Sequence, residues 1–257
     1  MVCGLAAALW DWRAGGELWD CAVPKKIILE ISVESVSGAL AAERGGAGRL
    51  ELCSDLSAGG VTPNDDLIPA LLQQVRLPVF GMIRPRAGGF VYSGAEFAAM
   101  GHSIRVAKAC GMDGVVLGIL TAGHTVDVVR TRELVELAAP LSVTFHRAFD
   151  VSADLQKSLL DVLQTGAQRI LSSGGAFDAL KGALTLAALR TAARGKIEIV
   201  PGTGINPGNV AEVARLTRAR EIHSGLGSVL SYGSEDYAAV ENEVRKMVIA
   251  LGESPKR

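Results

Sequence analysis

The chain has 257 residues, of which 49% are hydrophobic, enough for the core of one large domain. Its formal net charge of −1 provides no overall attraction to nucleic acid or to acidic membranes, so we expect neither as a partner. The four cysteines show no CxxC motif and no paired spacing, which predicts a reducing, cytoplasmic location. No apolar run reaches the roughly 18 residues of a membrane span.

The first residues differ in composition from the rest of the chain. All three tryptophans fall within residues 1–24, ahead of the first clear strand pattern. We interpret 1–24 as an N-terminal extension, and three alternatives stay open: a misassigned start, a disordered segment, or a flap over the domain. The tail at 252–257 is expected to be frayed, which leaves 25–251 for the folded domain.

Strand and helix patterns alternate along this domain. We predict strands at 27–32, 49–54, 78–83, 114–119, 141–146, 168–172, 196–200 and 220–224. We predict helices at 34–44, 94–110, 128–138, 153–165, 178–193 and 207–216, with a shorter one at 64–75. Such alternation is typical of parallel strands joined by crossover helices, and a (β/α)8 TIM barrel needs ~250 residues. The predicted fold is α/β, a single TIM barrel. An open doubly wound sheet is the alternative, but its strands would be nearly continuously apolar.

Several predicted strands are apolar on one face only. The first strand places Glu30 and Ser32 on the face opposite Ile27, Leu29 and Ile31. The second strand likewise has Glu51 and Cys53 on one face, and the fifth ends in His146. Side chains alternate across a strand, so helices that cover the apolar faces leave the polar faces pointing into one shared interior. A purely structural barrel interior is filled with valine, isoleucine and leucine. The polar faces therefore predict a functional site.

The functional residues of a barrel lie at the C-terminal ends of its strands and in the loops that follow. If the protein is an enzyme, its candidate catalytic residues are Glu30, Glu51, Arg84, His146 and Arg147. They would react, hold a metal or bind an anion. His223, at the end of the last strand, and Cys53, on the same face as Glu51, are placed in the same pocket. The alternative is a structural ion-pair network, in which the arginines neutralise the glutamates without catalysing anything.

Two glycine-rich turns follow the seventh and eighth strands. Barrels often bind phosphate there, because backbone N–H groups at such turns can donate to oxygens at little steric cost. The sequence therefore predicts an anion site at Gly202, Gly204 and Gly225, with simple turn geometry as the alternative.

Two classes of chemistry have no support in the sequence. No lysine lies at the C-terminal end of a predicted strand, where a Schiff-base aldolase needs one. The chain also has no P-loop and no full dinucleotide-binding fingerprint, which argues against redox chemistry with a nucleotide.

The strand-end motifs include Arg49-Leu50-Glu51-Leu52-Cys53-Ser54, Ile83-Arg84-Pro85-Arg86 and Val143-Thr144-Phe145-His146-Arg147-Ala148-Phe149-Asp150. Read in order, these motifs resemble the CutC copper homeostasis family over about residues 27 to 248. The resemblance implies a cytoplasmic, homo-oligomeric TIM barrel that binds copper, as the cuprous ion, at its C-terminal face. Several family members carry cysteine where this chain has Ser32 and Ser224.

With those two sulfurs replaced, Cys53 is the remaining thiol that matches the family. Cuprous copper prefers soft ligands, and one cysteine with a histidine can form a two-coordinate site. The resemblance thus implies Cys53, His223 and His146 as metal ligands.

Two other functions stay open. The first is a TIM-barrel enzyme, an isomerase or lyase, that uses Mg²⁺, Mn²⁺ or Zn²⁺ to polarise a carbonyl of a small phosphorylated or carboxylated metabolite. Arginine side chains hold such anionic groups bidentately. The second is a non-catalytic binding module whose polar interior is only an ion-pair network.

Overall fold

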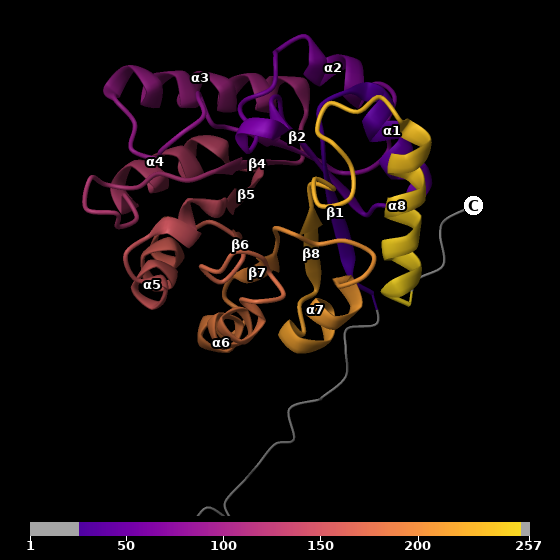
Figure 1. Cartoon of the computed structure of the whole chain (residues 1–257). Coiled ribbons are helices and arrows are strands. Elements are labelled where there is room, and N and C mark those ends of the chain that lie inside the picture. The colour runs from indigo at the N-terminus through magenta and orange to yellow at the C-terminus, as the bar shows by residue number, and fades with distance from the viewer. Residues whose placement is uncertain (1–25, 253–257) are drawn as a thin grey trace, which may run out of the picture.

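Strands and helices alternate along the whole barrel (Figure 1). The computed structural model describes residues 26–252, and this range contains eight strands and eight α-helices. The strands are β1 (Ile28–Val33), β2 (Arg49–Leu52), β3 (Val79–Met82), β4 (Gly114–Leu117), β5 (Ser142–Phe145), β6 (Arg169–Ser172), β7 (Glu198–Pro201) and β8 (Glu221–Ser224). The helices are α1 (Val36–Gly45), α2 (Leu67–Leu72), α3 (Gly94–Cys110), α4 (Val128–Ala138), α5 (Leu155–Thr165), α6 (Ala183–Ala193), α7 (Val210–Thr217) and α8 (Tyr237–Ala250).

The predicted α/β TIM barrel is confirmed. Each predicted strand is present, and the helices over 94–110 and 128–138 have the predicted bounds. The helix α8 was not among the predicted ones, and it begins where the Asp236 side chain accepts a hydrogen bond from the N–H of Ala239. Side-chain capping of this kind satisfies N–H groups that have no partner within the helix.

The helix predicted over 178–193 begins later, at Ala183. The segment before it turns sharply, with positive φ at Gly174 and Gly175. Gly182 lies so close to the preceding loop that a Cβ placed on it would be 1.8 Å from the carbonyl oxygen of Ser173. The packing of this loop on the end of β6 therefore overrides the helical pattern of the sequence.

All eight strands are parallel, and the helices lie around them (Figure 1). The hydrogen-bonded order is β7-β6-β5-β4-β3-β2-β1-β8, and β7 and β8 lie side by side where the barrel closes. Parallel registers place Glu30 level with both Arg49 and His223, and Ser32 level with Glu51. Polar side chains from β1, β2 and β8 thus share layers of the interior.

Two hydrophobic clusters hold the barrel together. The larger one joins the outward faces of the strands to the helices and includes Leu29, Ile31 and Leu50, each at most 2% exposed. The smaller one lies inside the barrel and consists of Cys53, Phe80, Met82 and Val116, with Leu56 packed against it. Alternation along each strand separates the two clusters, as the sequence predicts.

The proposed extension at 1–24 lies outside the described residues, as do residues 253–257 of the tail. Across 26–252, no helix combines the length and apolarity required to cross a membrane.

Candidate functional site

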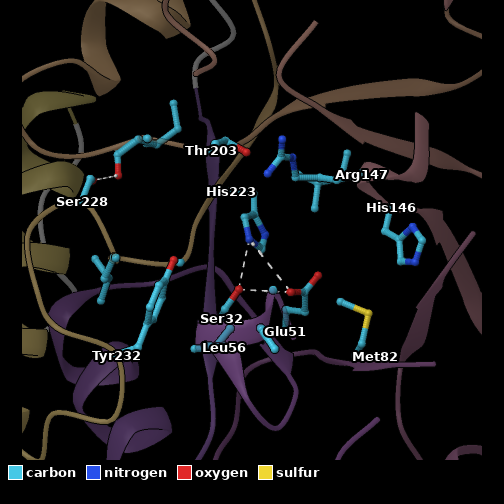
Figure 2. A pocket seen from close by; sticks show the side chains of 18 of the residues that line it. Ser32, Glu51, Leu56, Met82, His146, Arg147, Thr203, His223, Ser228 and Tyr232 are labelled. Atoms are coloured by element: carbon cyan, nitrogen blue, oxygen red, sulfur yellow. Dashed lines mark hydrogen bonds and ion pairs between the residues drawn. The ribbon is translucent and has the colours of Figure 1, made fainter. Parts of the chain in front are cut away.

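A pocket of about 240 Å³ opens at the C-terminal ends of the strands. Its lining includes one glutamate, two arginines and two histidines: Glu51, Arg84, Arg147, His146 and His223. Figure 2 shows Ser32, Glu51 and His223 meeting at the centre of the pocket, with His146 and Arg147 farther along its wall. Most of the predicted site residues thus face one space.

Three side chains form a triangle of two hydrogen bonds and one longer ion-pair contact at the base of the pocket (Figure 2). The Ser32 hydroxyl lies 3.1 Å from Glu51 Oε1 and 3.0 Å from His223 Nε2, and Nε2 lies 4.0 Å from Glu51 Oε1. Glu30, Glu51 and His223 each offer one ligand atom, and these three atoms all lie within 4.8 Å of one another. Carboxylate oxygen and imidazole nitrogen are common protein ligands of transition metals.

Glu30 orients His223 from behind. Glu30 Oε1 lies 2.7 Å from His223 Nδ1, and its other oxygen accepts a hydrogen bond from Arg49. Burial alone would raise the pKa of Glu30, but Arg49 and His223 outweigh it and hold that pKa at about 2. The ionised carboxylate therefore accepts a hydrogen bond from Nδ1–H and orients the ring so that Nε2 faces the pocket, as in carboxylate–histidine–metal arrangements.

Glu51 has one oxygen without a partner. The residue is 3% exposed, and its Oε2 atom accepts no hydrogen bond from any described residue. Burial, with a smaller effect of the Glu30 charge, raises the pKa of Glu51 despite its contacts with His223 and Ser32. A buried polar atom left unsatisfied costs about 1–3 kcal/mol, so this oxygen is suited to a cation or a ligand proton.

A structural ion-pair network exists, but below the pocket and with different arginines. Arg49 bridges Glu30 and Glu221 Oε2, the latter at 2.6 Å, and Arg169 donates to the same Glu221 oxygen at 2.8 Å. Both guanidinium groups lie over the ring of Phe80. The network neutralises Glu30 and leaves Glu51 outside it.

The guanidinium group of Arg84 donates hydrogen bonds to carbonyl oxygens of two loops. Its Nη1 donates to the carbonyl oxygens of Ala58 (3.1 Å) and Gly60 (2.9 Å), and its Nη2 donates to that of Gly88 (2.9 Å). Its Nε atom has no partner among the described residues, although the side chain is only 6% exposed. Arg84 therefore joins the loops after β2 and β3 and keeps an unpaired positive charge at the pocket wall.

His146 is a neutral donor. Its Nδ1 accepts the N–H of Ala148 at 3.2 Å, so the ring proton lies on Nε2, which is buried without a partner. Burial, followed by the charges of Arg84 and Arg147, lowers the pKa of His146 to about 3. At neutral pH the imidazole is uncharged and offers an N–H.

Arg147 lies at the mouth of the pocket. Its Nε donates to Asp150 Oδ2 at 3.1 Å, and its side chain is 45% exposed. Asp150 also accepts hydrogen bonds from the Ser172 hydroxyl and from the N–H groups of Ser173 and Gly175. This carboxylate fixes the short 3₁₀ helix Arg147–Val151 against the end of β6 and positions Arg147.

Cys53 is away from this group of ligand atoms. It is fully buried in the inner hydrophobic cluster, and its thiol lies 3.8 Å from the carbonyl oxygen of Val33. Burial, with smaller effects of Glu51 and Glu34, raises the pKa of Cys53 well above its usual value. The structure thus brings His223 to Glu51 and Glu30, and it does not bring Cys53 into the pocket lining.

Ser32 and Ser224 have different surroundings. Ser32 belongs to the triangle with Glu51 and His223. Ser224 donates to the carbonyl oxygen of Ile205 at 2.8 Å and accepts the N–H of Leu226, so it fixes the loop after β8.

Met82 is a pocket residue that the sequence analysis missed. Its thioether side chain lines the pocket beside Glu51 (Figure 2). The signal was available, because Met82 precedes Arg84 by two positions and the two therefore share a strand face.

The predicted anion-binding glycines separate into two groups. Gly204 and Gly225 line the pocket. Gly202 does not, because it packs inside the barrel, where an added Cβ would lie 2.5 Å from Leu171 Cδ1, and its N–H donates to the carbonyl oxygen of Ser172.

Comparison with known proteins gives a consistent family. The model of the CutC family matches residues 27–228. A CutC family protein of Chromobacterium violaceum is 46% identical over 79% of this chain and 83% of its own length. A mouse protein named copper homeostasis protein cutC homolog is 44% identical over 78% of this chain and 74% of its own length.

Solved structures agree. The crystal structure of a CutC protein from Streptococcus agalactiae matches with a TM-score of 0.74 and 31% identity, covering 77% of this chain and 98% of that one. Phosphoribosylanthranilate isomerase from Thermotoga maritima matches at 15% identity with a TM-score of 0.58, which shows the fold alone. By sequence and by structure, the chain belongs to the CutC family.

Proposed function

We propose that this protein acts in copper homeostasis by binding one copper ion at the base of the pocket, through His223 Nε2 and the carboxylate of Glu51. The observation that carries the proposal is the buried Glu51 Oε2 atom without a partner, next to an imidazole nitrogen that Glu30 orients toward the pocket. The copper assignment comes from the family, in which the mouse relative is named a copper homeostasis protein.

The chemistry of the donors bears on the oxidation state. Imidazole and carboxylate suit the cupric ion, whereas cuprous copper prefers sulfur. The prediction of a cuprous site depended on Cys53, whose thiol lies in the inner hydrophobic cluster. Met82 is the residue of the described pocket lining that carries sulfur. Its soft thioether could complete a cuprous site with His223. We therefore propose His223 as the shared ligand for either ion.

A copper titration tests this proposal. Purified protein is titrated with cupric ion in air and with cuprous ion under anaerobic, reducing conditions, each against a competing chelator. We expect one-to-one binding in the wild type. His223→Gln and Glu51→Gln should each weaken the copper affinity about 10- to 100-fold or more, since even indirect partners of a metal ligand contribute that much.

Two further variants sharpen the titration. His102, exposed on α3, is the matched control, and His102→Gln should bind copper like the wild type. Cys53→Ser should also retain binding. Loss of binding in Cys53→Ser with full retention in His223→Gln would place copper at the thiol and contradict the proposal.

A metal-dependent isomerase or lyase is the second candidate, favoured by the N–H donors that share the pocket with Glu51, namely those of His146 and the glycine loops. In that case Mg²⁺, Mn²⁺ or Zn²⁺ would raise the melting temperature of the wild type but not of Glu51→Gln. Equal responses of both proteins would contradict it.

We also propose a cytoplasmic, homo-oligomeric protein. The cysteine pattern supports the location and the family resemblance supports the assembly. Light scattering during gel filtration tests the assembly, and a mass equal to one chain of 26.8 kDa would contradict it.

A further inference from the structure

Beside the proposed metal site, the pocket presents hydrogen-bond donors that nothing in the protein uses. Arg147 pairs with Asp150 through Nε alone, so its two terminal nitrogens make no hydrogen bond to any described residue. In Figure 2 its side chain extends toward Thr203, at the beginning of the loop after β7. The fork of two N–H groups is free to hold two oxygens of one anion.

The loops after β7 and β8 add backbone donors on the same pocket. Within 26–252, the N–H groups of Gly204, Gly225 and Gly227 donate no hydrogen bond, and all three residues line the pocket. Thr203 and Gly204 both have positive φ, at 85° and 69°. A β-branched residue in this region is strained by about 1–3 kcal/mol, and such strain is concentrated at binding sites.

Two buried side chains point independently to a missing ligand. His146 is 3% exposed and its Nε2–H has no acceptor, and Arg84 is 6% exposed and its Nε–H has none either. Both line the pocket. Buried N–H groups are nearly always satisfied in native proteins, so the Nε2–H of His146 implies an acceptor that arrives with a ligand. The Nε–H of Arg84 adds to this, although the hydroxyl of Tyr92 also interacts with the Arg84 guanidinium.

The charges of the lining favour an anion. The charged side chains of the pocket are Glu51, Arg84 and Arg147, and its histidines are His146 and His223. The two arginines exceed the one carboxylate of the lining by one positive charge, which Asp150, the partner of Arg147 outside the lining, balances. A bound copper ion would neutralise Glu51 and leave a positive excess at the pocket.

We propose that this part of the pocket is a subsite for an oxyanion, the phosphate or carboxylate group of a small molecule. Arg147 and the N–H groups of Gly204, Gly225 and Gly227 bind its oxygens, and the unpartnered N–H groups of His146 and Arg84 bind the remainder of the ligand. The subsite goes beyond the metal site and uses none of its ligand atoms. It makes the protein a receptor for an anionic metabolite or for its complex with the metal.

Calorimetry of the full chain tests the subsite with two probes, inorganic phosphate and malonate. Each is titrated into protein stripped of metal with EDTA and into copper-loaded protein. We expect binding of at least one probe, weakened about 10- to 100-fold by Arg147→Ala, as for the loss of hydrogen bonds to a charged group.

Gly225→Ala provides a second variant that keeps the fold. Gly225 has no positive φ, and the nearest atoms to an added Cβ are the hydroxyl oxygens of Ser32 and Tyr232 at 3.9 Å, so the methyl group fits and takes up space in the pocket. It should weaken the same probe.

Each variant has a matched control outside the pocket. Arg44 is 54% exposed and pairs with one carboxylate, that of Glu241, as Arg147 pairs with Asp150. Gly89 has nothing within 4 Å of an added Cβ. Arg44→Ala and Gly89→Ala should bind the probes like the wild type.

The outcomes separate the sources of the anion and separate this proposal from the metal site. Binding of phosphate alone identifies a phosphorylated ligand, binding of malonate alone a carboxylated one, and binding of both a general oxyanion site. Failure of both probes with both forms of the protein, or equal binding in the wild type and the two pocket variants, overturns the subsite. Phosphate binding to the metal-free protein would survive even if copper did not bind.

Discussion

Glu30→Gln tests how the barrel interior supports the site. The carboxylate of Glu30 lies between Arg49 and Nδ1 of His223, and its pKa falls from 4.5 to about 2 in the folded protein. A shift of this size corresponds to about 3 kcal/mol of stability at pH 7. Removing one partner of a buried ion pair costs about 3–5 kcal/mol, which agrees. We therefore expect Glu30→Gln to lower the free energy of unfolding by about 3 kcal/mol.

The pH dependence of that loss is the stricter test. Because the folded-state pKa is lowered, the stability from Glu30 is fully present above pH 4.5 and is lost as the pH falls toward 2. Urea unfolding of the wild type and Glu30→Gln should differ by about 3 kcal/mol at pH 5.5 and by progressively less below pH 4.5. Glu212→Gln, which removes an exposed carboxylate 4.0 Å from Arg215, should change stability by less than about 1 kcal/mol. A wild-type advantage that stayed constant down to pH 3 would refute the assignment of the stability to an ionised Glu30.

Three other changes have defined outcomes. Gly202→Ala should destabilise the protein by about 1–3 kcal/mol in urea unfolding, because its Cβ would lie 2.5 Å from Leu171 Cδ1, whereas Gly94→Ala, with open space around it, should be neutral or stabilising. The pKa of His146 is lowered to about 3, so its contribution to the free energy of unfolding is fully present above pH 6.5 and falls by about 2 kcal/mol at pH 5. His146→Gln lacks this imidazole and should therefore lose less stability than the wild type between pH 7 and pH 5. Glu51→Gln should leave the metal-free protein at least as stable as the wild type in a thermal melt, because it removes a buried charge with an unpartnered oxygen.

Strand alternation accounts for what the sequence could predict of the site. Glu30 and Ser32 on β1 and His223 on β8 face the interior because parallel register fixes which side chains share a layer. The same rule places Glu51 and Cys53 on one face, but it ends where the strand ends. At Cys53 the chain has left β2. Gly60 of the following loop packs on its side chain, so that a Cβ added to Gly60 would lie 3.5 Å from the thiol sulfur.

The partners of the arginines could not be predicted in this way. Arg84 satisfies its guanidinium with carbonyl oxygens of two loops, and Arg147 pairs with Asp150 three positions later. Loop conformations are set by tertiary packing, and sequence alternation carries no information about them. The alternative in which these two arginines neutralise the glutamates does not hold for Glu30, whose guanidinium partner is Arg49.

The distribution of satisfied and unsatisfied groups separates support from function in this barrel. In the lower layer two arginines, Arg49 and Arg169, meet Glu30 and Glu221, so the charges cancel and each carboxylate has a guanidinium partner. In the layer above, Glu51 keeps a free oxygen, while the donors of His146 and Arg84 lack acceptors. Apolar replacements of unsatisfied polar groups are often neutral or stabilising, so stability does not explain this upper layer. A ligand that carries both a cation and oxygen atoms would satisfy all of it at once, and the neutral layer below would hold His223 rigid while it binds.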